Sequence, residues 1–210
     1  MRRFLPTLAI AAMVMIAGAS ADAQTRVHTE MVRPGPLPPA NAGPRPEVVV
    51  TGNIPPPPEV VTDVTRLPPA VARMRERILA AARTGELEAV VAVMRSNGNM
   101  PIFSLNAERD PLTYWRRDYP ESGGVEILAI LADILETGFV HVDQGTPEEK
   151  YVWPYFARVP LKTLTPAQKV DLFRIVTGGD YKDMLDTGAY NFYRIGIGQD
   201  GAWRFFVTGN

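Results

Sequence analysis

Hydrophobic residues recur at helical or strand spacing from about residue 70 to the end of the chain. Apolar positions three or four residues apart predict helices within 70–85, 86–95, 111–117, 125–138, 166–177 and 181–186. Short, densely apolar runs predict extended segments at 102–105, 139–142, 151–157, 191–197 and 202–209. This mixture predicts an α+β domain over 70–210, with a small, mostly antiparallel sheet packed against several helices.

The last two extended segments predict a C-terminal β-hairpin with a defined register. Their connection suits a three-residue loop, Gln199–Gly201, in which Gly201 is left-handed. That loop would place six apolar side chains on the core face and Phe206 on the opposite face. The predicted cross-strand pairs are Ile197–Trp203, Ile195–Phe205 and Tyr193–Val207.

Two other elements carry specific expectations. Apolar residues cover most of the circumference of the helix predicted within 125–138, which indicates a central, heavily buried helix. The strand predicted at 151–157 contains Pro154, which cannot donate to a sheet ladder. We therefore expect this strand at an edge of the sheet or at a bulge.

The first 69 residues have a different pattern. Residues 1–23 combine Arg2 and Arg3, a short apolar run and a small-x-small site ending at Ala23, which is typical of a cleaved secretory signal peptide. The alternative is an uncleaved anchor, although the apolar run is short for a bilayer. Between residues 34 and 69 there are 12 prolines, so we expect 24–69 to be a disordered linker.

Composition narrows the function classes. The net charge of −1 becomes −2 when the predicted signal peptide removes two basic residues and one acidic residue, so nucleic acid is not an expected partner. No second apolar run reaches about 18 residues, so no membrane span is expected after signal cleavage. The chain has no cysteine and only two histidines, so neither a metal site nor a thiol nucleophile is expected. No phosphate or dinucleotide motif is present, and no cofactor is expected.

Candidate catalytic residues are His141 and Asp143. They lie two positions apart in a predicted strand, so their side chains would point to the same side and the carboxylate would orient the imidazole. The alternative is a histidine at a strand end followed by an aspartate that starts a turn. No serine lies in a nucleophile motif beside them.

Candidate binding residues are Tyr151, Trp153 and Tyr155. On a continuous strand these three rings would share one face, and their polar tips suit a half-exposed surface that stacks on sugars or on a partner. The alternative is that both faces of this strand are buried in the core.

The stretches YVWPYFARVPL, LTPAQKVDLFRIVTGGDY and AYNFYRIGIGQDGAWRFFVTG resemble a family of small exported alphaproteobacterial proteins of unknown function. The resemblance covers about residues 70–210 and implies a single periplasmic domain behind a signal peptide and a linker. In the linker, residues 47–52 (EVVVTG) are similar to the TonB box of outer-membrane receptors, which implies an envelope partner bound by strand addition. A chance valine run is the alternative.

Together these features predict a periplasmic or secreted protein that acts as a non-enzymatic binding module of the cell envelope, with an envelope glycan or protein as its partner. Two alternatives remain at this point. One is a glycan- or peptide-processing enzyme that uses His141 and Asp143, and the other is a component of a TonB-type pathway that uses residues 47–52.

Overall fold

The computed structural model describes residues 57–106 and 108–209. The predicted signal peptide, the TonB-box-like residues 47–52 and most of the predicted linker lie outside the described residues. The helices are α1 (Pro69–Ala82), α2 (Leu87–Arg95), α3 (Pro111–Asp118), α4 (Glu126–Leu135), α5 (Pro166–Leu172) and α6 (Gly178–Thr187). Three short 3₁₀ helices are η1 (Val64–Arg66), η2 (Tyr155–Ala157) and η3 (Leu161–Thr163).

Five antiparallel strands form one sheet in chain order, β1-β2-β3-β4-β5. They are β1 (Val60–Val61), β2 (Phe139–Val142), β3 (Lys150–Trp153), β4 (Arg194–Gly198) and β5 (Trp203–Val207). The predicted α+β fold with an antiparallel sheet and a C-terminal hairpin is confirmed.

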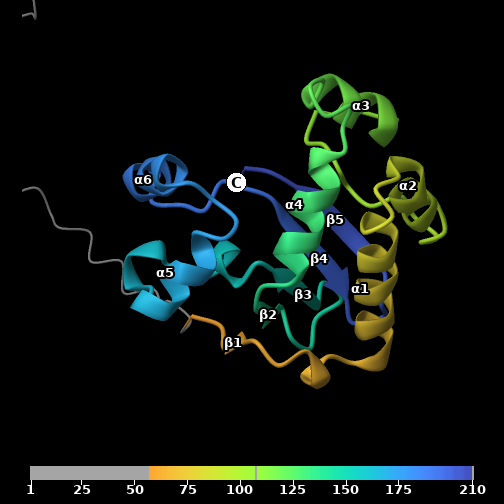
Figure 1. Cartoon of the computed structure of the whole chain (residues 1–210). Coiled ribbons are helices and arrows are strands. Elements are labelled where there is room, and N and C mark those ends of the chain that lie inside the picture. The colour runs from red at the N-terminus through yellow and green to blue at the C-terminus, as the bar shows by residue number, and fades with distance from the viewer. Residues whose placement is uncertain (1–56, 107, 210) are drawn as a thin grey trace, which may run out of the picture. The chain divides into compact units, whose positions relative to one another are not determined.

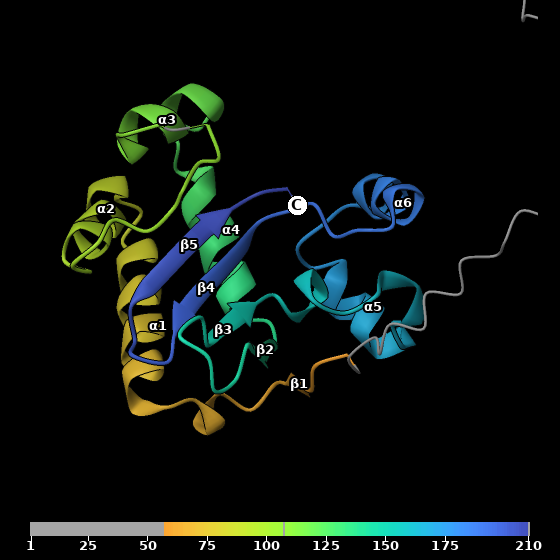
Figure 2. The ribbon, with the colours of Figure 1, turned by 180° about the vertical axis from the view of Figure 1, so that it is seen from behind.

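Helices cover one face of the sheet (Figure 1), and on the other face helical residues pack mainly against β2 and β3, so β4 and β5 are open in Figure 2. Helix α4 passes in front of β4 in Figure 1 and behind β4 and β5 in Figure 2, so it covers one face, and α1 packs against α4 and β4. The apolar side chains of α1, α2 and α4 join Ile195, Ile197 and Phe206 in the larger core cluster. A second cluster on the other side joins Val140 and Val152 to residues of η2, η3, α5 and α6.

Helix α4 is buried on one side only. Its buried residues are Ile127, Leu128, Leu131, Ile134 and Leu135. Val125 precedes the helix and is 47% exposed, and Ala129 is also exposed. The expectation of a helix buried around most of its circumference is therefore only half met, because no other helix lies in front of α4 in Figure 1.

The folded domain begins before residue 70, which corrects the predicted linker boundary. Val60 and Val61 pair with Val140 and Phe139, and the side chains of Val61 and Leu67 are buried. The reason is local composition, because residues 59–67 contain no proline and can donate backbone hydrogen bonds. Pro69 does not prevent helix formation, since it occupies the first turn of α1, where its missing N–H has no partner to lose.

The C-terminal hairpin has the predicted loop and an unpredicted bulge. Gly201 has a φ of 82°, the N–H of Gly198 donates to the oxygen of Ala202 at 2.8 Å, and Ile197 pairs with Trp203 as predicted. Beyond that pair the register shifts by one residue, so the two remaining predicted pairs are wrong. The observed pairs are Gly196–Phe205, Ile195–Phe206 and Arg194–Val207.

The bulge follows from the glycine at position 196. The Phe205 ring lies over Gly196 so closely that a Cβ there would stand 2.3 Å from ring atom Cε1. This packing turns Phe205 away from the larger core and brings Phe206 into it, where Phe206 is fully buried. The three-residue loop predicted the opposite arrangement, with Phe205 in the core. Residue type could not correct this prediction, because both positions are phenylalanine.

Strand β3 is shorter and more central than predicted. It ends at Trp153, and Tyr155–Ala157 forms η2 instead of continuing the strand. β3 lies between β2 and β4, which corrects the expectation of an edge strand or bulge. Pro154 is compatible with this position because it follows the last ladder residue, so no cross-strand donor is missing.

Candidate functional site

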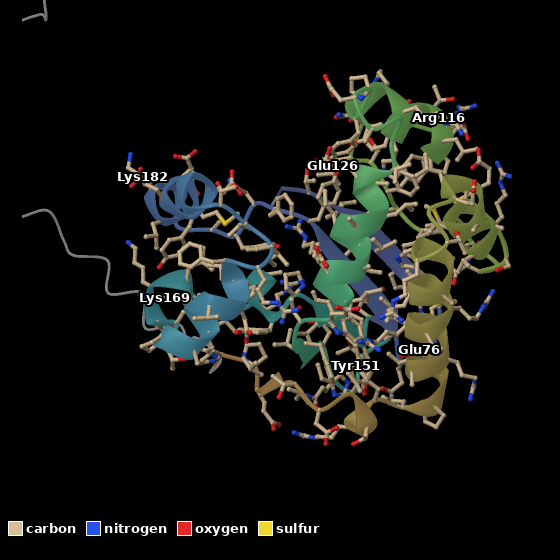
Figure 3. All side chains as sticks on the ribbon, viewed as in Figure 1. Glu76, Arg116, Glu126, Tyr151, Lys169 and Lys182 are labelled. Atoms are coloured by element: carbon tan, nitrogen blue, oxygen red, sulfur yellow. The ribbon has the colours of Figure 1, made fainter. Side chains whose placement is uncertain are left out.

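A cavity of about 240 Å³ lies between the β1–η1 segment and the end of the sheet formed by β2 and β3. Figure 3 shows the labelled Tyr151 beside this first segment of the described chain. We call the cavity the His141 pocket. Its lining residues are Pro58, Glu59, Val61, Arg66, Phe139, His141, Gln144 and Tyr151.

An imidazole–carboxylate pair forms part of this site. The Nε2 atom of His141 lies 2.7 Å from Oε1 of Glu149, and the other carboxylate oxygen accepts from the N–H of Gly145 at 2.9 Å. The Gly145 N–H, followed by the His141 hydrogen bond, lowers the pKa of Glu149 below its usual range. An ionised carboxylate only accepts hydrogen bonds, so Nε2 of His141 is the donor. In the neutral imidazole, Nδ1 then carries the free lone pair.

His141 also stacks on the neighbouring strand. Its ring lies parallel to the Tyr151 ring, with 4.3 Å between centroids and 9° between planes, because the two residues are opposite one another in the β2–β3 ladder. The Tyr151 hydroxyl donates to Oε1 of Gln199 at 3.3 Å. Burial, with Glu149 as a smaller cause, raises the pKa of Tyr151, so the phenol stays protonated near neutral pH.

The expected pairing of His141 with Asp143 is corrected. Strand β2 ends at Val142, and Asp143 adopts a left-handed conformation with a φ of 56° that turns the chain away from the strand. The Asp143 carboxylate instead accepts from Nζ of Lys150 at 2.6 Å. The partner of His141 is Glu149, eight residues later. The sequence could have suggested it only if the length of the turn between β2 and β3 had been known.

The three aromatic candidates do not form an exposed platform. Tyr151, Trp153 and Tyr155 are 5%, 0% and 1% exposed, respectively. Tyr155 lies in η2 and packs in the second core cluster, so it does not share a face with Tyr151 and Trp153. Of the three, only Tyr151 lines the His141 pocket.

An ion pair forms the outer wall of the pocket. The guanidinium of Arg66 donates from Nη1 to Oε1 of Glu59 at 2.7 Å and from Nη2 to Oε2 at 3.4 Å. This contact lowers the pKa of Glu59. Both residues fall inside the predicted linker, where the sequence pattern gives no sign of a binding site. Gln144, which completes the polar lining, donates to the backbone oxygen of His141 at 3.4 Å.

Within 57–106 and 108–209, no group of three or more histidine, aspartate or glutamate side chains is placed to hold a metal ion. In the same part of the chain, no helix has both the length and the apolar character needed to cross a membrane.

Comparison with protein-family models, with curated proteins and with solved structures returned no match. The resemblance to small exported proteins therefore stays a prediction, and the functional argument rests on the geometry of the His141 pocket.

Proposed function

We propose that this protein is a non-enzymatic binding module of the cell envelope, periplasmic or secreted, and that it binds a small polar ligand in the His141 pocket. The signal-peptide pattern and the proline-rich stretch before the domain support an exported, tethered module. The single observation that carries the binding proposal is the convergence of Glu59, Arg66, His141 and Gln144 around one cavity.

The physical basis is the mixture of groups in the lining. Binding sites for small molecules are concave and combine apolar walls with a few placed polar groups that orient the ligand. In the His141 pocket, Val61 and Phe139 supply apolar surface, while His141 and Gln144 supply hydrogen-bonding atoms. The Glu149 carboxylate and the Tyr151 ring hold the imidazole in place before a ligand arrives, which lowers the ordering cost of binding.

The test is a screen of the full chain, uniformly labelled with ¹⁵N, against neutral sugars, amino acids, small carboxylates and small amines at millimolar concentration. We expect at least one probe to shift amide resonances of Gln144 and its neighbours in a saturable manner. Gln144→Ala should weaken that response, whereas Lys182→Ala, an exposed change on α6, should leave it unchanged. If no probe shifts resonances of the pocket residues, the proposal is overturned.

The processing-enzyme alternative keeps His141 but replaces Asp143 by Glu149 as the group that orients the imidazole. The lining includes no serine, threonine, cysteine or lysine nucleophile, and its one carboxylate, Glu59, is held by two hydrogen bonds from Arg66. This favours binding over group transfer. Incubation of the full chain with peptidoglycan fragments, followed by mass spectrometry, separates the two. A new product that requires His141 would replace the binding proposal by the enzymatic one.

The TonB-type partner remains a separate proposal, since residues 47–52 lie outside the described residues. A pull-down from envelope extract with the full chain and with a chain lacking 47–52 tests it. Capture of a TonB-like protein that is lost with the deletion would support this partner, and equal capture by both chains would contradict it.

A further inference from the structure

The size of the His141 pocket limits its ligand. At about 240 Å³ the cavity lies below the range of roughly 300–1,000 Å³ that is usual for drug-sized ligands. The occupant is therefore about the size of a single ring with its substituents. A longer polymer would place only one of its units inside.

The charges of the lining argue against a charged occupant. Glu59 and Arg66 neutralise one another through two hydrogen bonds. Outside the lining, the Glu149 carboxylate accepts hydrogen bonds from His141 and from the N–H of Gly145, and Lys150 pairs with Asp143. A carboxylate or ammonium ligand would have to break one of these contacts to obtain a counter-charge. A charged ligand that broke none of them would lose hydration without gaining a counter-charge, which is unfavourable.

The remaining groups suit hydroxyls. Nδ1 of His141 and the carboxylate of Glu59 accept hydrogen bonds, the guanidinium of Arg66 donates them, and the amide of Gln144 does both. A hydroxyl group both donates and accepts, so a polyhydroxylated ring can use all four. The apolar part of the lining is small, because Val61, Phe139 and Tyr151 are at most 6% exposed, and it suits a few C–H groups of such a ring. The apolar and aromatic lining residues are Pro58, Val61, Phe139 and Tyr151.

We infer that the His141 pocket takes one neutral, hydroxyl-rich ring, the chemistry of a single uncharged glycosyl unit. This inference rests on the proposed binding function and names the class of its ligand. The site differs from the aromatic platform expected from the sequence, since Trp153 and Tyr155 take no part in it. The unit is either a free monosaccharide or the end of a glycan.

The experiment compares three sugars that share one ring and differ in charge: glucose, glucosamine and glucuronate. Each is titrated into the ¹⁵N-labelled full chain at neutral pH. We expect glucose to saturate the resonances of the pocket residues and the two charged sugars to bind at least about tenfold more weakly, the cost of an unpaired charge. N-acetylglucosamine and its β-1,4-linked disaccharide form a second pair. Tighter binding of the disaccharide indicates a glycan end, and equal binding indicates a free monosaccharide.

Variants connect the response to the pocket. Gln144→Ala and His141→Ala should each weaken glucose binding, and Lys182→Ala should not. Gln144 is exposed, so its variant remains informative if His141→Ala lowers the stability of the fold. If a charged sugar binds as well as glucose, or if only non-sugar probes shift pocket resonances, the inference is overturned and the binding function stands. If no probe of any kind reaches the pocket, both are overturned.

Discussion

The two ends of the β2–β3 pair use similar side chains for different purposes. At one end, Trp153 packs on Phe139 with 5.2 Å between ring centroids, and the Trp153 side chain has no exposed surface. At the other end, Tyr151 packs on His141 at 4.3 Å and both rings line a cavity. Tyr151 and Trp153 are only two residues apart and lie on the same face of β3. The difference lies in what covers each ring, and strand periodicity alone does not determine that.

The end of the β2–β3 pair at Trp153, which we call the closed end, contains an unfavourable donor left unpaired among the described residues. The end at His141 and Tyr151, which we call the open end, does not. In the described part of the chain, the indole Nε1 of Trp153 has no hydrogen-bond partner. An unmet donor in the core is unfavourable, so the indole must be retained for its packing. The polar atoms of His141 and Tyr151, in contrast, contact Glu149 and Gln199. The comparison indicates that the closed end supplies stability and the open end supplies binding groups.

Trp153→Ala should have the largest effect on stability. Removing a fully buried indole leaves a cavity, and we expect the free energy of unfolding to fall by about 3–5 kcal/mol. Urea unfolding followed by circular dichroism measures this change, and Trp153→Phe serves as the milder control. A loss below about 1 kcal/mol, within the ordinary scatter of point mutations, would show that the closed end is not a stability centre.

Tyr151→Ala should affect both stability and binding. Loss of the buried ring should cost about 2–4 kcal/mol and remove the surface on which His141 stacks, so ligand-induced shifts should disappear. Tyr151→Phe keeps the ring and loses only a long hydrogen bond, at about 0.5–1 kcal/mol, and should retain binding. Unfolding curves and the NMR titration together measure the two effects. Equal loss of binding in Tyr151→Ala and Tyr151→Phe would contradict the proposal that the Tyr151 ring forms part of the pocket lining.

Glu149→Gln should have a smaller effect that depends on pH. The pKa of Glu149 is lower in the folded chain than its usual value of 4.5, so ionisation of this group favours the fold above that pH. We expect Glu149→Gln to be less stable than the parent at neutral pH, with a difference that shrinks as the pH falls below 4.5 through the folded-state pKa. Thermal unfolding across this range is the measurement.

The neighbouring Glu148→Gln is the matched control for this experiment, since the Glu148 side chain makes no hydrogen bond within the described residues. Its stability difference from the parent should not follow the same pH dependence. Parallel curves for the Glu148 and Glu149 variants would indicate a general charge effect instead of the pair with His141.

Asp143→Asn should have the smallest effect. Asparagine also tolerates a left-handed backbone and can still accept from Lys150, whose side chain is 14% exposed against 46% for Asp143, so we expect a change of about 0.5 kcal/mol or less. The affinity for the sugar probe should stay the same. A loss of binding in Asp143→Asn, measured by the same titration, would return Asp143 to the functional site beside His141.

Much of the fold was predictable because its signals are local. The core residues of α1 and α2 follow helical spacing, and the loop from Gln199 to Gly201 follows from turn chemistry. The bulge in β5 was not predictable, because it depends on the fit of the Phe205 ring over Gly196 across the strand pair. The central position of β3 was missed for a related reason, since Pro154 restricts a strand only where the ladder includes it.

The candidate site was predictable only in part. His141 and Tyr151 were identified from residue type and strand position, and they do lie together. Glu149 was missed because its place depends on the turn that follows β2, and Glu59 and Arg66 were missed because the prolines on either side obscured a proline-free segment. The pocket forms only when the segment containing Glu59 and Arg66 lies against β2 and β3, and local sequence patterns do not predict that contact.

The outer edge of β5 is occupied by a single residue of the same chain. The N–H of Ile102 donates to the oxygen of Arg204 at 3.0 Å, and the oxygen of Ile102 accepts from the N–H of Phe206 at 2.7 Å. A free sheet edge invites strands of other molecules to add to it and is a common start of aggregation. By using these two backbone groups internally, Ile102 removes the positions at which an incoming strand would first bind. Ile102 adds little to the core, since its side chain is 57% exposed, yet its backbone thereby covers the edge of an apolar hairpin against self-association.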